Sequence, residues 1–195
     1  MRGLIERYVR EMVKIPSTSN TEMEKNCADY IAEELAKQPY FKEHPEQTGK
    51  YLLPEDSLGR SVPWGLVKGN GGSRKTIILT GHYDVVDTEE YGNERALAYD
   101  VEKWENLVKS GNVLPGMPDE VKEDFLSGDW MFGRGTADMK GGLSVGLVLL
   151  DWYGKIVAEA EGKASSVAVS EAEVASELGD ASGISGNLLF VTVPD

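Results

Sequence analysis

The sequence has 195 residues, which is enough for one domain with a substantial core but few for two. Its 20 basic and 33 acidic residues give a net charge of −13, which argues against nucleic acid or an anionic membrane as a partner. No apolar run reaches the ~18 residues of a membrane span, and the N-terminus lacks the apolar stretch of a signal peptide. The only cysteine, Cys27, cannot form an internal disulfide, so we expect a cytoplasmic protein.

The N-terminal part of the chain predicts two helices. Apolar residues recur with helical spacing over residues 4–13, and the polar residues 17–20 end that pattern. Thr21 and Glu24 match a capping box, which predicts a second helix from there to about residue 37. The inward-facing residues of this second helix are predicted to be Cys27, Ile31 and Leu35.

Three further segments predict strands. Residues 62–68 and 75–80 are separated by the sequence GNGG, which adopts positive φ easily, so we expect an antiparallel hairpin. The uninterrupted apolar run of residues 76–79 suits a strand buried on both faces. Residues 187–193 form another apolar run. The helix predicted at residues 143–160 lies between these two strands, which implies that they are parallel neighbours.

The rest of the chain completes the predicted architecture. Two short helices, in residues 101–109 and 118–126, are predicted in a long insertion and are placed over the mouth of the site. Residues 161–186 are small and acidic, and they predict loops with a surface helix at about residues 171–178. Together these elements predict an α/β fold with a mixed, mostly parallel sheet, helices on both faces and a site at the strand ends.

A candidate metal ligand follows the strand at residues 75–80. His82 and Asp84 stand two positions apart just beyond the strand, so their side chains point the same way if the chain stays extended. A metal-ligating histidine usually donates its other ring N–H to a carboxylate. We therefore interpret His82 as a ligand and Asp84 as the catalytic-site carboxylate that orients it. The alternative is an ordinary hydrogen-bonded histidine.

The glycine-rich stretch FGRGTADMKGG, residues 132–142, has three interpretations. As a dinucleotide-binding loop it is disfavoured, because Asp138 replaces the third glycine and would repel a pyrophosphate. As a structural loop, its glycines would permit a tight entry into the next helix. As part of a metal site, it would present Asp138 as a carboxylate shared by two metal ions about 3.5–4 Å apart.

Taken together, GHYDVVD, GRGTADMKGG and LLFVTVPD resemble the zinc-dependent exopeptidases and deacylases. That family includes acetylornithine deacetylase, succinyl-diaminopimelate desuccinylase and bacterial glutamate carboxypeptidases. The three motifs occur in the family's order and cover nearly the whole chain. The spelling GHYDVVDTEEYG, with the long gap between positions 82 and 138, is most similar to the arginine-utilisation branch.

The resemblance implies a di-zinc site, with cobalt or manganese as alternative metals. In it His82 is a ligand of one zinc, Asp84 orients His82, and Asp138 bridges both ions. The resemblance also implies a cis peptide bond after Asp138. The implied reaction is hydrolysis of an amide bond in a short peptide or a small N-acyl amino acid, and the branch implies a role in arginine catabolism.

The sequence also departs from the family. There, two glutamates, the general base and a zinc ligand, follow the strand that matches residues 187–193, whereas Pro-Asp follows here. His44 is expected to be solvated, and His82 with Asp138 cannot fill two tetrahedral zinc sites. We therefore expect residues 1–195 to be the N-terminal part of the catalytic domain of a larger metallohydrolase, inactive alone. The alternative is a non-catalytic binding or regulatory protein on the same scaffold.

Overall fold

The structure is a computed structural model that describes residues 1–111, 116–161 and 185–194. Its helices and strands are α1 (Arg2–Val13), α2 (Glu24–Lys37), α3 (Pro39–Glu43), η1 (Pro45–Gln47), β1 (Thr48–Leu52), β2 (Ser61–Lys68), β3 (Thr76–His82), η2 (Glu89–Leu97), α4 (Val101–Ser110), α5 (Asp119–Ser127), α6 (Lys140–Ala160) and β4 (Asn187–Val193). The elements η1 and η2 are 3-10 segments. The surface helix expected at about residues 171–178 lies outside the described residues.

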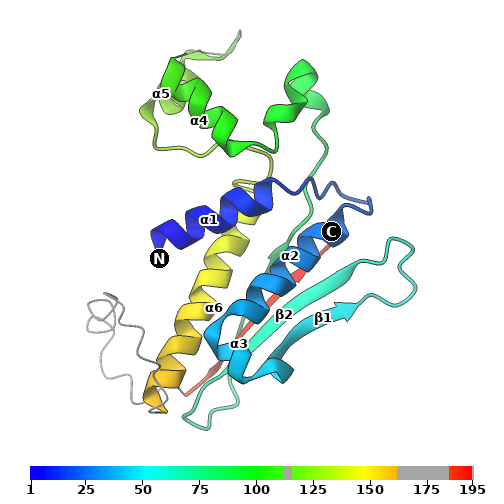
Figure 1. The fold of residues 1–195 in the computed structure, drawn as a ribbon, viewed down its shortest axis with the longest axis vertical. Coiled ribbons are helices and arrows are strands. Elements are labelled where there is room, and N and C mark those ends of the chain that lie inside the picture. Colours follow the sequence, from blue (N-terminus) through cyan, green and yellow to red (C-terminus); the bar gives the residue numbers. More distant parts are fainter. Residues whose placement is uncertain (112–115, 162–184, 195) are drawn as a thin grey trace.

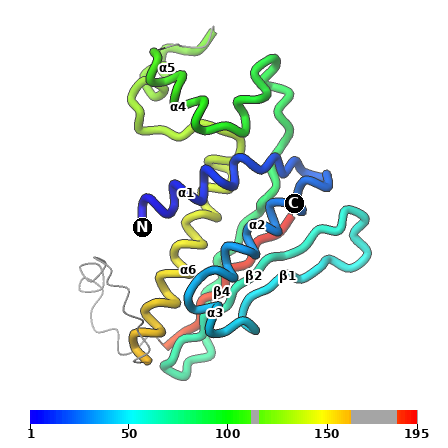
Figure 2. Tube along the Cα trace, viewed as in Figure 1, coloured from blue at the N-terminus to red at the C-terminus, as the bar shows by residue number. Residues whose placement is uncertain are grey.

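The four strands form one sheet in the order β1-β2-β4-β3 (Figures 1 and 2). Strand β2 pairs antiparallel with β1 and β4, whereas β3 pairs parallel with β4. The sheet is therefore mixed, as predicted, although only one pairing between the described strands is parallel. The prediction that residues 75–80 and 187–193 are parallel neighbours is confirmed.

The predicted hairpin between β2 and β3 is wrong, because β4 lies between these strands. Their glycine-rich connection runs past the beginning of β4. There the Gly69 N–H donates to the Asn187 side chain at 3.2 Å, and the Ser73 N–H donates to the Ser185 carbonyl at 2.9 Å. A Cβ on Gly71 would lie 2.6 Å from Ser185 Cα, so glycine is required for this approach. In its inner position, the apolar β4 satisfies backbone groups along both of its edges.

Strand β3 lies at the edge of the described sheet, which overturns the expectation that it is buried on both faces. Ile77 is 67% exposed and Ile78 is 57% exposed. A short apolar run has the same composition at the centre and at the edge of a sheet, so the sequence pattern could not distinguish the two positions.

Helices α2 and α6 cover one face of the sheet, and α1 packs against α6 (Figure 1). Two glycines bring these layers together. A Cβ on Gly65 of β2 would lie 2.8 Å from the Phe41 ring, and a Cβ on Gly146 of α6 would lie 2.7 Å from the Phe190 ring. The residues predicted to face inward from α2 are all fully buried: Cys27, Ile31 and Leu35.

The two faces of the sheet differ in how well they are covered. Gly65 pairs with Phe190 on the face that α6 contacts, and Trp64 pairs with Val191 on the opposite face. Trp64 and Val191 remain partly exposed, whereas Phe190 is buried. Among the described residues, the main helix contacts with the sheet are thus on one face, rather than on both as expected.

Helix α6 is the central helix of the core. By length and composition alone it is apolar enough to cross a membrane, although no apolar run of that length is expected from the sequence. In the structure, 56% of its most apolar window is buried inside the fold, against α1 and the sheet. This burial makes α6 a core helix of the fold described here.

The loop between α1 and α2 does not form the predicted capping box. Thr21 Oγ1 accepts from the Met23 N–H at 3.3 Å, and α2 begins at Glu24 without a side-chain cap. Glu24 is buried, and its carboxylate accepts from the Asn20 N–H at 2.6 Å. Its Oε1 also lies 3.5 Å from Arg60 Nη1. Glu24 therefore anchors the preceding loop inside the fold.

Candidate metal site

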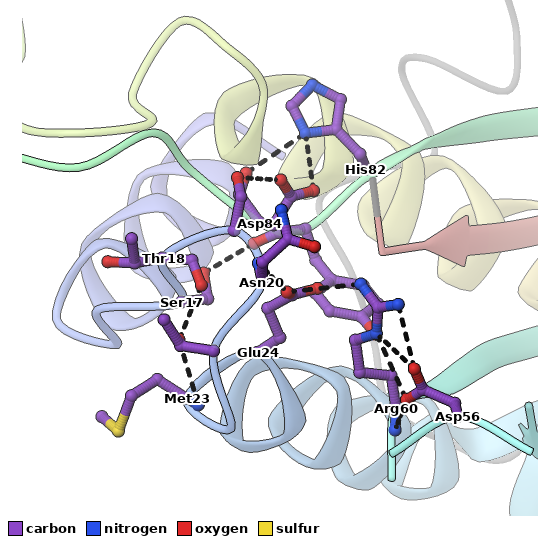
Figure 3. A network of polar contacts seen from close by, with 12 residues as sticks. Ser17, Thr18, Asn20, Met23, Glu24, Asp56, Arg60, His82 and Asp84 are labelled. Carbon is purple, nitrogen blue, oxygen red and sulfur yellow. Dashed lines mark hydrogen bonds and ion pairs between the residues drawn. The ribbon is translucent and has the colours of Figure 1, made fainter. Parts of the chain in front are cut away.

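His82 ends β3 and is held by Asp84. Its Nδ1 lies 3.1 Å from the Asp84 carbonyl oxygen and 3.2 Å from Asp84 Oδ1 (Figure 3). With its proton on Nδ1, the ring donates to Asp84 and leaves the lone pair of Nε2 for another partner. Asp84 itself is buried, at 2% exposure. The predicted orienting role of Asp84 therefore has the geometry that it requires.

Asp138 approaches the second ring nitrogen of His82, Nε2. Its Oδ1 lies 3.1 Å from His82 Nε2, and its side chain is 87% exposed. The peptide bond between Asp138 and Met139 is cis, which confirms that prediction. Gly135, at φ 84°, allows close packing before Asp138, since a Cβ there would lie 2.8 Å from Val85 Cγ1. The glycines thus shape the loop, and this loop presents the carboxylate to His82.

The imidazole and the carboxylate have the chemistry and the spacing of two ligands to one cation. Tetrahedral zinc binds nitrogen and oxygen ligands at about 2.0–2.2 Å, which places neighbouring ligand atoms about 3.4 Å apart. The 3.1 Å between His82 Nε2 and Asp138 Oδ1 fits that arrangement. Within the described residues, no group of three or more His, Cys, Asp or Glu side chains is suited to a metal. The residues present therefore fit two positions of a coordination sphere.

The electrostatics of the site favour positive charge at His82. Burial lowers the pKa of His82, but the hydrogen bond to Asp138 and the charge of Asp84 outweigh burial and raise the pKa above its ordinary value. A divalent cation between the imidazole and Asp138 would satisfy the same two carboxylates. The other histidine, His44, packs against Tyr40 with ring centroids 4.6 Å apart and the rings tilted by 39°, and it does not line the pocket.

The three predicted site residues share a pocket of about 310 Å³. The rest of its lining consists of Ser19, Val85, Val86 and residues 133–137. This volume is at the lower end of the range for small-molecule sites, about 300–1,000 Å³. The predicted helices of the insertion exist as α4 and α5, but neither contributes to the lining, so their expected place over the mouth is not observed.

Two residues that the sequence did not indicate hold the site together. The Ser19 hydroxyl donates to Asp84 Oδ2 at 2.5 Å. Lys140 is fully buried, and its ammonium donates to the carbonyl oxygens of Met12 at 2.9 Å and Ile15 at 2.6 Å, at the end of α1. Burial lowers the pKa of Lys140. In the sequence, only the position of Lys140 within the glycine-rich motif could have indicated its role. The residue spacing gives no sign that this lysine is buried.

Solved metallopeptidase structures have a similar fold. The match to the M20 family metallo-carboxypeptidase Sso-CP2 from Sulfolobus solfataricus covers 97% of this chain and 30% of the Sso-CP2 chain, with a TM-score of 0.50 and 17% identity. The match to human carnosine dipeptidase 1 covers 97% of this chain and 31% of the dipeptidase chain, with a TM-score of 0.54 and 14% identity. The chain thus has part of an M20-type metallopeptidase fold, which confirms the predicted fold class.

Two proteins of Bacillus subtilis are similar to this chain in sequence. The chain is 34% identical to Protein RocB of Bacillus subtilis (strain 168) over 146 residues, which are 75% of this chain and 25% of RocB. It is 38% identical to the uncharacterised protein YqjN of the same strain over 141 residues, 72% of this chain and 24% of YqjN. No protein-family model matches the chain. The chain is therefore a relative of RocB that spans about a quarter of the length of these curated relatives.

Proposed function

We propose that this chain supplies part of the active site of a zinc-dependent hydrolase that cleaves an amide bond in a short peptide or a small N-acyl amino acid. The observation that carries the proposal is the approach of His82 Nε2 to Asp138 Oδ1 at 3.1 Å, in a pocket where Asp84 holds the other ring nitrogen. The M20-type fold supports the same reaction class.

Each residue has a distinct proposed role. His82 would hold one zinc ion through Nε2, and Asp84 accepts the hydrogen bond from Nδ1–H and so fixes the direction of the ring. Asp138, whose carboxylate is largely exposed, would be shared between this ion and a second one. Bound zinc would polarise the amide carbonyl and lower the pKa of a water molecule.

We propose that the remaining ligands and the general base belong to a longer protein. The chain spans about a quarter of its curated relatives, and the described residues bring only this pair of ligands together. The 195-residue chain alone should therefore bind zinc weakly and should not turn over substrate. The resemblance to the arginine-utilisation branch supports a role in cytoplasmic arginine catabolism. The charge of −13 argues against nucleic acid or an anionic membrane as a partner.

Zinc binding by the whole chain tests the proposed site. Titration against a coloured chelator should show binding that is lost in His82→Ala and in Asp138→Asn. His44→Ala is the matched control, because it removes the only other imidazole and lies outside the pocket. Binding that survives His82→Ala, or that is lost in His44→Ala, would refute this ligand assignment.

An activity assay tests the proposed inactivity of the chain alone. With added zinc, no hydrolysis of N-acyl amino acids is expected, because the general base is proposed to belong to a longer protein. Hydrolysis that disappears in His82→Ala would show instead that the chain is sufficient. A wild-type chain that binds no zinc would favour the second candidate, a non-catalytic binding or regulatory protein. The supporting observation is that the described part of the chain brings no group of three or more metal-binding side chains together.

A further inference from the structure

A short loop between α1 and α2 packs along the segment that follows β3. We call residues 17–20 the strap. Thr18 forms an isolated parallel bridge with Val85. On either side of it, the Val85 N–H donates to the Ser17 carbonyl at 2.8 Å, and the Ser19 N–H donates to the Val85 carbonyl at 2.9 Å. The strap is thus fixed by backbone hydrogen bonds to the residue that follows Asp84.

Side chains of the strap reach the same segment. The buried Ser17 hydroxyl donates to the Tyr83 carbonyl at 2.7 Å. The Ser19 hydroxyl donates to Asp84 Oδ2 at 2.5 Å and lies 3.2 Å from the Val85 carbonyl. The two carboxylate oxygens of Asp84 therefore have different partners: Oδ2 accepts from Ser19, and Oδ1 faces His82 Nδ1 at 3.2 Å.

We propose that Ser19 is a positioning residue for the metal site, an inference that rests on the proposed function. The outer torsion of an aspartate is soft, so hydrogen bonds to both carboxylate oxygens restrain the carboxylate plane more than a bond to one oxygen does. A short hydrogen bond from a hydroxyl to an ionised carboxylate is among the stronger ones in proteins. By holding Oδ2, Ser19 keeps Oδ1 on Nδ1 beside the Asp84 carbonyl oxygen, and so supports the direction of Nε2 toward Asp138.

The C-terminal end of the strap is also held by hydrogen bonds. Asn20, at φ 61°, donates its N–H to the buried Glu24 carboxylate, and Arg60 lies beside that carboxylate. Thr21 Oγ1 donates back to the Thr18 carbonyl at 2.6 Å. Figure 3 shows these polar contacts continuing from His82 and Asp84 through the strap to Glu24, Arg60 and Asp56. These hydrogen bonds hold both ends of the strap, so the Ser19 hydroxyl is kept in a fixed position.

The same geometry argues against a nucleophilic pair of Ser19 and His82. In a Ser–His pair, a ring nitrogen of the histidine accepts the proton of the serine hydroxyl. Both ring nitrogens of His82 face aspartates, Nδ1 toward Asp84 and Nε2 toward Asp138. The Ser19 hydroxyl is directed to Asp84, so its effect on the site passes through the orientation of that carboxylate.

The test compares Ser19→Ala with wild type in the full chain, by two readouts. The first is zinc affinity, which should fall about tenfold, the lower end of the loss seen when a group supporting a metal ligand is removed. The second is long-range ¹H–¹⁵N NMR of the metal-free imidazoles, at a pH where they are neutral. There the share of the His82 tautomer with its proton on Nδ1 should fall. His44→Ala assigns the two histidine signals.

Three further variants complete the design. Ser19→Thr keeps the hydroxyl and should retain the wild-type tautomer and affinity, whereas Ser19→Val has a similar shape without the hydroxyl and should behave like Ser19→Ala. This pair decides the question if Ser19→Ala fails to fold. Ser144→Ala is the matched control, because it removes a buried hydroxyl that donates to the Lys140 carbonyl and does not line the pocket. It should change neither readout.

The outcomes separate the two proposals. If wild type binds zinc through His82 while the Ser19 variants change neither affinity nor tautomer, the positioning role is refuted and the proposed function stands. If wild type binds no zinc but loss of the hydroxyl shifts the tautomer, the positioning role stands and the proposed function fails. A loss of affinity without a tautomer shift also refutes the mechanism, because Ser19 would then act by another route.

Discussion

Gly141 marks the tightest backbone approach next to the candidate site. A Cβ on this residue would lie 2.2 Å from the Thr136 carbonyl oxygen. On the next residue, Gly142, a Cβ would meet only the Met139 Cε, at 3.5 Å, which is ordinary contact. The two glycines share the first turn of α6, so they differ mainly in the space around them and form a matched pair.

Alanine at these two positions should change stability in opposite directions. Gly141→Ala should lower the free energy of unfolding by about 1–3 kcal/mol, the usual range for overpacking. Gly142→Ala should be neutral or stabilising by up to about 1 kcal/mol, because alanine favours helix more than glycine does. Urea unfolding followed by circular dichroism measures both. Equal effects would contradict the packing argument.

Glu34 of α2 is a nearly buried carboxylate held by two cations. Its oxygens lie 3.1 Å from Arg7 Nη2 and 2.7 Å from Lys37 Nζ. Burial raises the pKa of Glu34, but the hydrogen bonds from Lys37 and Arg7 outweigh burial and lower the pKa below its ordinary value. This carboxylate links α2 to α1, so its protonation should affect how the two helices pack.

The lowered pKa predicts a loss of stability in acid. A carboxylate with a lower pKa in the folded state stabilises the fold above its unfolded pKa of about 4.3, and the contribution is lost as pH falls through the folded pKa. Stability measured from neutral to acidic pH should therefore fall less steeply in Glu34→Gln than in wild type. The exposed neighbour provides the control: Glu33→Gln should keep the wild-type slope. Parallel curves for Glu34→Gln and wild type would contradict the prediction.

At the scale of the elements, sequence patterns predicted the features that depend on residues close together in the chain. The helical spacing of apolar residues gave α2 its buried face, and the two-residue separation of His82 and Asp84 predicted their contact. The approach of Asp138 to His82 followed from the family resemblance rather than from spacing, since the two residues are 56 positions apart.

Strand order and the supporting residues depend on contacts that no local pattern encodes. The position of β3 at the edge depends on where β4 pairs, and β4 begins more than a hundred residues after β3 begins. Ser19 belongs to a polar cluster that indicated only the end of a helix, and its role appears when the strap meets Asp84. Lys140 is buried because α1 ends above it with two carbonyl oxygens that its ammonium binds.

At the scale of the whole molecule, one side of the described sheet presents apolar side chains to solvent. Ile78 pairs with Leu189 on the face opposite α6, and Tyr51 at the other edge of the sheet is 58% exposed. Within the described part of the chain, β3 has a neighbouring strand on one side only. Exposed strand edges and apolar patches promote association between chains.

Lysine on this surface should reduce self-association of the chain. Ile78→Lys places a charge on the edge strand, where the exposed side chain has room for it, so the free energy of unfolding should change by less than about 0.5 kcal/mol. Sedimentation velocity over a range of concentrations should show a larger monomer fraction than in wild type. Val121→Lys, an exposed position on α5, is the control and should leave association unchanged. A concentration-independent wild-type monomer would contradict the prediction.

The place of β4 within the sheet has a consequence for synthesis on the ribosome. Translation produces β2 and β3 well before β4, yet each of them pairs with β4 and not with the other. A nascent chain that has released only its first three strands can complete the β1–β2 ladder, but β3 must wait for residues 187–193 to emerge. The apolar β3 is therefore exposed to chaperones throughout the interval in which α4, α5 and α6 are being made.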